Sequence, residues 1–492
     1  MSKKTQSYTN RKHRKYIPER MPGNVAVKNK GGWLPGANGR AAKVEALLRG
    51  RKEETKEIAG NMAGYKDSGV EWIGAIPKGW KFVPLKDSFY FVAGGTPLSN
   101  VLSNWDEGVA WVTPADFKTD KMYISKGARS LSKKGYQSCN AKMLPPGSII
   151  FSKRAPIGSV AINTAELCTN QGCIGLLNKT KNANNKYFYY ILSIATQTFE
   201  ALGAGVTFKE ISIKNFGNVS LPLPPLPEQQ RIADFLDTKC GILDRTIDAV
   251  SRQIEDLEKY KKALITKTVT KGICKKGEPE RAMKDSGVEW IGEDIPFDWD
   301  INRLQFCIDE ISERNYAGKE THILSLMKDK GVIPYEEKGR VGNISKTDLT
   351  QYKLAYQNTL ITNSMNIIIG SSGISQYKGC VSPAYYVFKA KPNNDIRYFN
   401  YIFAVRAFQN ECRRFANGIL EIRLRISSTN LLKIKVPVPP LAEQQQIADY
   451  LDEKCKNIDN RVQKRRQQLE WLKEYKKSMI FDYVTGKKRV EK

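Results

Sequence analysis

The sequence predicts an α+β protein in which two mixed α/β domains are separated by two long antiparallel coiled-coil helices, with an internal pseudo-two-fold repeat. Three observations predict this fold: an internal duplication, a heptad pattern of apolar residues in each copy, and two dissimilar inserts of domain size. The chain has 492 residues, 41% of them hydrophobic, which is enough for several packed cores.

The duplication consists of a frame that occurs twice. The segment KDSGVEWIG at 66–74 recurs unchanged at 284–292. A second block, PLPPLPEQQRIADFLD from Pro222, is matched from Pro437 at a constant offset of 215 residues. Between these blocks lie a first insert (75–221) and a second insert (293–436), which show little similarity to each other. The pattern predicts two related halves that carry different inserts.

The second repeated block predicts one long helix in each half. Its prolines favour an extended segment before the helix, and apolar residues then recur every seven residues from Leu236 to Leu264. The second copy keeps the pattern from Leu451 to Met479, except at Arg465. A helix of about 40 residues is roughly 60 Å long. Each helix is the simplest partner for the other, and the alternative is that each packs on its own domain.

Each insert is predicted to mix strands and helices. Runs of β-branched residues broken by Gly and Pro, in 147–162 and 359–388, indicate strands joined by tight turns. Aromatic-rich segments at 185–192 and 397–403 are typical of buried helices.

The charge predicts a nucleic-acid partner. Lys and Arg number 79 against 51 Asp and Glu, a net charge of +28 that a polyanion would neutralise. A merely soluble basic protein is the alternative. Arg and Lys can bond guanine, although a phosphate contact or a solvated charge is the alternative for each residue alone. Basic and polar candidates at predicted loop tips are Lys153, Arg154, Thr207, Lys209, Arg423 and Arg425.

Catalytic motifs are missing from the sequence. The Pro-Pro pairs lack the Asn/Asp-Pro-Pro-aromatic pattern of DNA methyltransferases, and the phosphate-binding loop of ATPases is absent. The chain has two histidines, which argues against His-based catalysis. Nine scattered cysteines fit reduced thiols, and Cys168 and Cys173 lack the further ligands of a zinc site. Without a signal peptide or an apolar run of about 20 residues, we expect a cytoplasmic protein and no membrane contact.

The repeated blocks resemble the conserved regions of specificity subunits of Type I restriction-modification enzymes. The resemblance rests on 224–233 and its second copy, on the start at 69–74, and on the helix ends at 268–272 and 484–487. It covers roughly residues 62–492, and the duplication makes it specific.

Motifs in the inserts resemble those of the family's target recognition domains. The first insert has GGTP at 94–97, WVT at 111–113 and SKRAPIG at 152–158, and the second has NSMN at 363–366 and VSPAYY at 381–386. On this resemblance we add further DNA-binding candidates. They are Thr96, Thr113, Ser152, Asn170, Gln171, Asn363, Ser364, Asn366, Ser382 and Tyr385.

The resemblance implies a non-catalytic subunit that reads a bipartite site in double-stranded DNA. Each recognition domain would read one half of the site, and the helices would set the length of the unread spacer. Two modification subunits, which bind S-adenosylmethionine, and restriction subunits, which use ATP and Mg²⁺, would assemble on it, so no cofactor or metal is expected in this chain. A coiled-coil assembly scaffold that does not read DNA is the alternative.

The resulting division of the chain has six parts. Residues 1–61 precede the usual start of the family and hold fifteen Lys/Arg against five Asp/Glu. We expect this extension to be flexible; a binding arm, a disordered tail and a mis-assigned start codon remain open. The other parts are recognition domain 1 (62–225), the central conserved helix (226–272), a linker (273–283), recognition domain 2 (284–440) and the C-terminal conserved helix (441–492).

Overall fold

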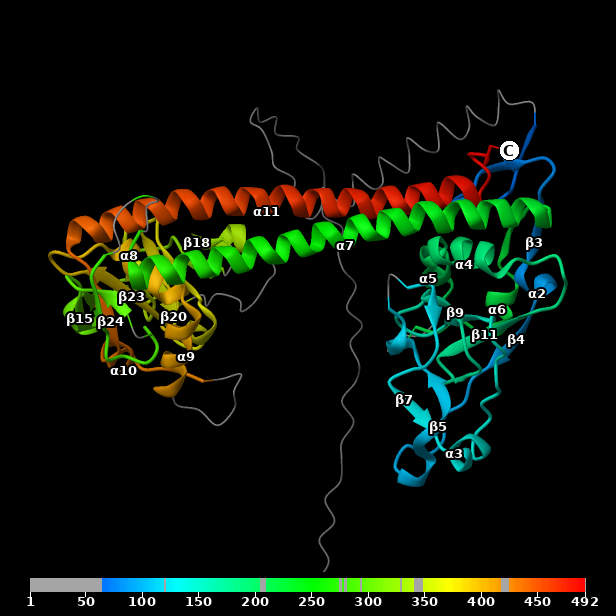
Figure 1. The fold of residues 1–492 in the computed structure, drawn as a ribbon, viewed down its shortest axis with the longest axis horizontal. Helices are drawn as coiled ribbons and strands as arrows, with labels where there is room; N and C mark the ends of the chain where they lie inside the picture. Colours follow the sequence, from blue (N-terminus) through cyan, green and yellow to red (C-terminus); the bar gives the residue numbers. More distant parts are fainter. Residues whose placement is uncertain are drawn as a thin grey trace, which may run out of the picture. The chain divides into compact units, whose positions relative to one another are not determined.

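The chain divides into two units between Lys81 and Phe82, and Figure 1 labels its helices and strands. The computed structural model describes residues 64–118, 121–203, 209–273, 277, 281–292, 294–327, 330–339, 348–416 and 424–491. The basic extension 1–61, Thr207, Arg423 and part of the predicted linker therefore lie outside the described residues.

A β-hairpin lies at each copy of the KDSGVEWIG segment. In the first unit β1 (Tyr65–Asp67) pairs with β2 (Ala75–Pro77), and in the second unit β13 (Met283–Asp285) pairs with β14 (Asp294–Pro296). The carboxylates of Asp67 and Asp285 accept the backbone N–H two residues later, at 3.0 and 2.9 Å. Those donors belong to Gly69 and Gly287, whose φ angles of 73° and 60° favour glycine. Identical residues thus form the same turn twice.

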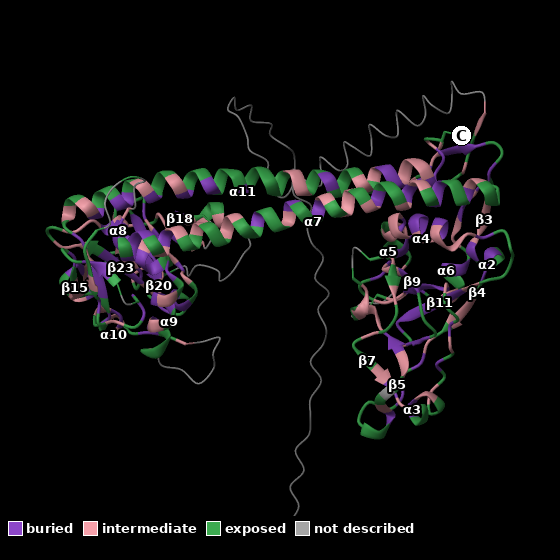
Figure 2. Cartoon of the chain, in the orientation of Figure 1, coloured by how far each residue is buried: buried purple, intermediate pink, exposed green. Residues whose placement is uncertain are grey.

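Two long helices follow the two proline-rich segments. Helix α7 spans Leu226–Lys271 (46 residues) and α11 spans Leu441–Val484 (44 residues). They pack against each other through an apolar seam, with Ile247 and Ile254 of α7 and Ile458 and Leu472 of α11 all buried. Figure 2 shows such buried positions alternating with exposed ones along both helices.

Cross-helix ion pairs fix the direction of this packing. Lys261 binds Asp459 at 2.7 Å, and Lys476 binds Asp244 at 2.5 Å. As residue numbers rise along α7 they fall along the contacted part of α11, so the helices run antiparallel. Arg465, at the interruption in the second heptad series, is exposed, whereas Val250, its counterpart 215 residues earlier, is buried.

The first insert is built around a five-stranded sheet of order β4-β11-β8-β9-β6, with a separate three-stranded sheet of order β10-β5-β7. Its strands are β3 (Lys81–Pro84), β4 (Phe89–Ala93), β5 (Trp105–Val112), β6 (Tyr123–Ile124), β7 (Arg129–Leu131), β8 (Ile149–Ser152), β9 (Val160–Asn163), β10 (Cys168–Thr169), β11 (Cys173–Asn178) and β12 (Ser220–Leu223). Its helices are α2 (Leu85–Ser88), η1 (Leu102–Asn104), η2 (Pro114–Asp116), α3 (Lys133–Gln137), α4 (Asn185–Ile194), α5 (Thr196–Leu202) and α6 (Ile213–Gly217).

The second insert has a four-stranded sheet of order β16-β23-β20-β21 and three strand pairs, β15-β24, β17-β18 and β19-β22. Its strands are β15 (Asp300–Arg303), β16 (Ile308–Glu310), β17 (Leu324–Met327), β18 (Gly331–Pro334), β19 (Lys353–Ala355), β20 (Leu360–Asn363), β21 (Ser372–Ile374), β22 (Gly379–Val381), β23 (Tyr385–Ala390) and β24 (Lys435–Val438). Its helices are η3 (Leu304–Phe306), η4 (Tyr335–Lys338), η5 (Ile367–Ile369), α8 (Ile396–Ala404), α9 (Arg406–Arg414) and α10 (Ser428–Leu432).

The central sheets of the two inserts share one topology although their sequences differ. In the first insert, β11 pairs antiparallel with β4 and with β8, and β8 pairs antiparallel with β9. In the second insert, β23 pairs antiparallel with β16 and with β20, and β20 pairs antiparallel with β21. An aromatic helix then follows, α4 or α8, with Tyr187 and Tyr398 fully buried at matching positions. The predicted mixture of strands and buried aromatic helices is confirmed in both inserts.

Each insert docks on both long helices. The Tyr187 hydroxyl lies 2.9 Å from the carbonyl oxygen of Pro222, just before α7, and 3.0 Å from that of Val484, at the end of α11. The Tyr398 hydroxyl makes the matching contacts to Pro437 (3.0 Å) and Val269 (3.1 Å). The first insert therefore contacts the start of α7 and the end of α11, and the second insert contacts the opposite ends.

Candidate DNA interface

Three segments that are distant in the sequence meet at the end of strand β8. The backbone N–H groups of Lys153 and Arg154 both donate to the carbonyl of Gly172, at 2.9 and 3.3 Å. The N–H of Ile211 donates to the carbonyl of Lys153 at 3.0 Å. The loops after β8, before β11 and before α6 thus form one continuous edge of the first insert.

The GGTP segment joins the same edge because glycine allows a close backbone approach. A Cβ on Gly94 would lie 2.1 Å from the carbonyl oxygen of Asn170, and the N–H of Gly95 donates to Thr169 at 2.8 Å. This approach places the Thr96 hydroxyl on the side chain of Gln171, to which it donates a hydrogen bond. Only glycine fits at position 94, so the motif has a structural reason.

Thr113 has a local role at the same edge. Its hydroxyl and its backbone N–H both bond the carboxylate of Asp116 at 2.8 Å, and Asp116 also accepts the N–H of Ala128 at 2.7 Å. The half-buried Thr113 therefore caps η2 and ties it to the following loop.

One carboxylate at this edge pairs with two cations. Glu210 pairs with the ammonium group of Lys153 and, at 2.7 Å, with Nε of Arg154. Burial favours the neutral form of Glu210, but the hydrogen bonds from the two cations outweigh it and lower its pKa. The side chain of Arg154 is 42% exposed, against 13% for Lys153, so Arg154 is the cation that faces solvent.

The second insert has the same backbone arrangement at the end of β20. The N–H of Ser364 donates to the carbonyl of Ala384 at 3.3 Å, and the N–H of Ile426 donates to the carbonyl of Ser364 at 3.3 Å. The preceding turns also match: Asn170 accepts the N–H of Gly172 at 2.9 Å, and Ser382 accepts that of Ala384 at 3.5 Å. The candidates in the two inserts therefore occupy equivalent places.

The side chains at these equivalent places differ in chemistry. Arg154 corresponds to Met365, since each lies one residue after the residue whose carbonyl accepts the Ile211 or Ile426 N–H. By the same backbone matching, Gln171 corresponds to Pro383 and Glu210 to the exposed Arg425. The backbone edge is common to both inserts, and what it presents to solvent is not.

Burial sorts the predicted site residues. Ser152 and Ser364 are fully buried, and the Ser152 hydroxyl donates to the backbone carbonyls of Arg154 and Pro156 in its own turn. Asn363 accepts the N–H of Met365 at 3.0 Å, which makes it a turn residue. The exposed candidates are Thr96, Gln171, Lys209, Asn366 and Arg425, and the half-buried ones are Thr113, Lys153, Arg154, Asn170, Asn363, Ser382 and Tyr385.

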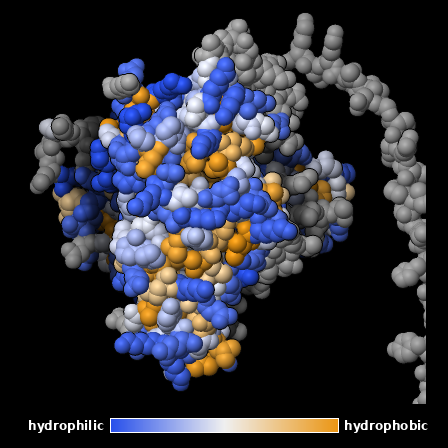
Figure 3. Space-filling view, turned by 90° about the vertical axis from the view of Figure 1, so that its right-hand side faces the viewer, coloured by the Kyte–Doolittle hydropathy of each residue, from blue (hydrophilic) through white to orange (hydrophobic). Residues whose placement is uncertain are grey.

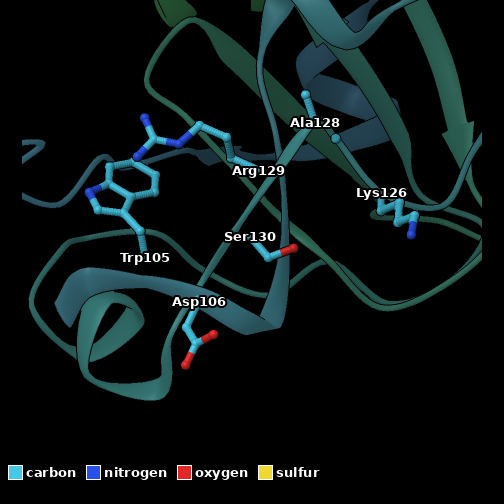
Figure 4. Close-up of a pocket in the computed structure, with 7 residues that line it drawn as sticks. Trp105, Asp106, Lys126, Ala128, Arg129 and Ser130 are labelled. Carbon is cyan, nitrogen blue, oxygen red and sulfur yellow. The ribbon is translucent and has the colours of Figure 1, made fainter. Parts of the chain in front are cut away.

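A basic hollow at strands β5 and β7 was not predicted from the sequence. The guanidinium of Arg129 lies 3.5 Å from the ring centroid of Trp105, and Lys126 and Asp106 line the same hollow (Figure 4). The indole N–H of Trp105 is buried without a hydrogen-bond partner among the described residues. The basic residues at 126 and 129 were visible in the sequence, but nothing in it placed them beside residue 105.

In the face shown in Figure 3, hydrophobic residues form patches between hydrophilic ones. No helix in the described part of the chain is long and apolar enough to span a membrane. Within the same residues, no group of three or more His, Cys, Asp or Glu side chains is arranged to hold a metal ion.

Comparisons with known proteins agree with this organisation. The chain is 27% identical over 436 residues to the Type I restriction enzyme MjaIX specificity subunit of Methanocaldococcus jannaschii, covering 85% of this chain and 96% of that protein. It is 23% identical over 223 residues to the EcoR124I/EcoR124II specificity subunit of Escherichia coli, covering 44% and 52%. A chain from a structural study of complex assembly and conformational transition in the type I R-M system has a similar fold, with a TM-score of 0.61, 15% identity, and coverage of 83% and 98%.

The model of the Type I restriction modification DNA specificity domain matches residues 77–259 and 303–470, one match in each half. These two matches include most of both inserts and most of both long helices. The chain therefore belongs to this family, and its role is DNA sequence specificity in a Type I restriction-modification system.

Proposed function

We propose that this chain is the non-catalytic DNA-recognition subunit of a Type I complex and that its two inserts read the two halves of a bipartite site. The observation that carries this proposal is the equivalence of the two candidate edges, one per insert, on inserts that contact opposite ends of α7 and α11. A helix of 46 residues is roughly 69 Å long at ~1.5 Å per residue. That length is about two turns of B-DNA at 34–36 Å each, which suits two separated half-sites.

The length of the coiled-coil helix pair would set the distance between the two half-sites, and the pair would have a pseudo-two-fold axis. The Lys261–Asp459 and Lys476–Asp244 pairs are copies of one interaction, because each residue recurs 215 positions later. The Tyr187 and Tyr398 contacts repeat in the same way. Such an axis would pass between residues 252–253 of α7 and 467–468 of α11, and so the two inserts would meet the DNA in opposite orientations.

The partners follow from the family role and from this symmetry. We infer that two modification subunits, which bind S-adenosylmethionine, occupy the two equivalent surfaces, and that restriction subunits use ATP and Mg²⁺. Methyl transfer and cleavage would then belong to those chains, and this one would hold no cofactor and act in the cytoplasm beside DNA.

Methylome mapping tests the proposal. The chain is co-expressed with its modification subunit in a host that lacks other methyltransferases, and methylated positions are mapped by single-molecule sequencing. We expect a split motif with one methylated adenine in each half. An unmodified genome despite a stable complex would instead support an assembly scaffold that does not read DNA.

Shortening the two helices tests whether their length sets the spacer of the motif. Deleting seven residues from α7 and the equivalent seven from α11 shortens both helices by about 10 Å and keeps the heptad register. The spacer in the motif should shorten by about three base pairs at ~3.4 Å each, while both half-sites keep their sequence. An unchanged spacer would refute the proposal that helix length sets spacer length.

A further inference from the structure

We propose that Arg154 and Gln171 are the base-reading side chains of the first insert and that Glu210 and Thr96 hold them in the reading orientation. This inference rests on the proposed function, because it names the residues that read one half-site. It distinguishes them from neighbours that contact only phosphate or that stabilise the turn.

Arg154 is anchored at one end and open at the other. Its Nε donates to Oε2 of Glu210 at 2.7 Å, and its side chain is 42% exposed. Among the described residues, nothing accepts a hydrogen bond from its two terminal nitrogens. A guanidinium fixed through Nε presents those nitrogens as a fork, which matches O6 and N7 of guanine. Anchoring also reduces the rotamer entropy lost on binding.

Gln171 is anchored in the same way. Its amide oxygen accepts the hydroxyl proton of Thr96, and the residue is exposed. The oxygen keeps a second lone pair and the amide nitrogen keeps its donors, so the side chain can pair with N6 and N7 of adenine. The turn below it is fixed, because the Asn170 side chain accepts the N–H of Gly172.

The two side chains leave adjacent backbone. Gly172, next to Gln171, accepts the N–H of Arg154 through its carbonyl at 3.3 Å. Two readers so placed suit neighbouring base pairs. Lys153 differs from both, since its ammonium group pairs with Glu210 and only 13% of its side chain is exposed. It offsets the charge of Glu210, which leaves the cluster of Lys153, Arg154 and Glu210 with one net positive charge facing DNA.

The second insert presents a different set at the same places. Met365 and Pro383 stand where Arg154 and Gln171 stand, and neither side chain donates a hydrogen bond. Met365 is 39% exposed and suits an apolar contact such as a thymine methyl group. We therefore assign purine reading by Arg154 and Gln171 only to the half-site that the first insert contacts.

The test compares the methylomes of the wild-type complex and of single variants. Arg154→Gln should relax one guanine position in one half-site, and Gln171→Ala should relax an adjacent adenine position in the same half. The other half should stay unchanged. A bidentate contact corresponds to roughly 10- to 100-fold discrimination against the wrong base. Glu210→Gln and Thr96→Val should lower discrimination at the same two positions by a smaller factor.

Duplex chemistry separates base reading from phosphate contact. Replacing the assigned guanine by 7-deazaguanine should weaken binding of the wild-type complex about tenfold or more and leave binding of the Arg154→Gln complex unchanged. Lys209→Gln is the matched control, since Lys209 is exposed beside Glu210. It should weaken binding to all sequences equally and reduce the salt slope by about one.

Each contrary outcome has its own meaning. An unchanged motif in Arg154→Gln, with only a reduced salt slope, would make Arg154 a phosphate contact and overturn the inference. If Arg154→Gln methylates nothing, the wild-type complex decides: binding that 7-deazaguanine leaves unchanged at every guanine of that half-site would also overturn the inference. A wild-type complex without any split motif would instead refute the proposed function itself.

Discussion

Gln229, in the repeated Glu-Gln-Gln segment, joins the first insert to α7, and its replacement by methionine should weaken that joint strongly. The side chain is 0% exposed. Its oxygen accepts the N–H of Asn184 at 2.9 Å, and its nitrogen donates to the carbonyls of Asn182 and Pro224, both at 2.9 Å. Methionine has similar length and no polar group to replace these bonds.

The expected cost follows from three backbone groups left without partners. A hydrogen bond contributes about 1 kcal/mol net, and an orphaned buried group costs about 1–3 kcal/mol. Water can reach part of the joint, so we expect Gln229→Met to lower the free energy of unfolding of the first insert by about 3 kcal/mol. Gln444→Met should cost less, about 2 kcal/mol, because one of its three contacts is a 3.5 Å bond to the Asn394 side chain.

Hydrogen exchange at single amides measures this change locally. The Asn184 amide should exchange roughly 100-fold faster in Gln229→Met, since about 1.4 kcal/mol corresponds to tenfold. Gln445→Met is the matched control, because Gln445 is exposed on the same helical turn as Gln444, and it should change stability by less than about 0.5 kcal/mol. If Gln229→Met behaves like this control, the joint does not depend on the buried amide.

Three further outcomes are expected. Arg465→Val should raise the free energy of unfolding of the helix pair by about 1 kcal/mol in chemical denaturation, because its counterpart Val250 is buried in the seam; the exposed control Lys464→Val should give no gain, and a loss in Arg465→Val would count against the seam assignment. The hydrogen bonds from Lys153 and Arg154 lower the pKa of Glu210 in the folded state. They stabilise the folded state above the unfolded pKa of ~4.3, and this contribution is lost as the pH falls through the lower pKa of the folded state. Glu210→Gln should accordingly flatten the acid limb of stability measured from pH ~6 to ~3, and an unchanged limb would contradict the ion-pair geometry. Among the eight described cysteines, Cys139 should react first with a maleimide, since the other seven are buried; in mass spectrometry, earlier labelling of one of those seven would contradict this.

The long helices could be predicted from sequence because their signal is local and repeated. Each apolar residue in the heptad pattern reports the same face, so the prediction does not depend on any single position. Arg465 weakened the pattern without removing it, and the structure resolves the exception by leaving the side chain exposed. The antiparallel direction needed more than the pattern, because a seam alone does not say which end meets which.

The shared topology of the inserts was not predicted, because strand order depends on contacts between distant residues. One local signal was present: α4 and α8 agree at Tyr187/Tyr398, Phe188/Phe399 and Tyr190/Tyr401 at an offset of 211 residues. In the structure these tyrosines bind the long helices, Tyr190 to Asp237 at 2.7 Å and Tyr401 to Asp452 at 2.6 Å. The matching aromatics therefore mark docking positions.

The candidate site was predicted in part. Arg154 and Arg425 were chosen by residue type and turn position and Gln171 by the resemblance, and all three side chains face solvent at the meeting edges. The same criteria could not show that Ser152 turns inward or that Glu210 pairs with both neighbouring cations. Such pairing depends on how the loop after β8 meets the loop before α6. The DNA contacts of these residues stay predictions.

The way this edge is built explains how the two inserts can differ in surface chemistry without losing their fold. The bonds that hold the edge run between backbone atoms, from the N–H of residue 153 or 364 to the carbonyl of residue 172 or 384. Every residue type offers the same backbone N–H and carbonyl groups, except that proline lacks the N–H. An exposed side chain at this edge can therefore change while the edge persists. The docking contacts to the long helices, in contrast, use particular side chains, the paired tyrosines and glutamines. A substitution at the exposed edge should then alter which bases are read, and one at the docking contacts should alter stability and the spacing of the half-sites.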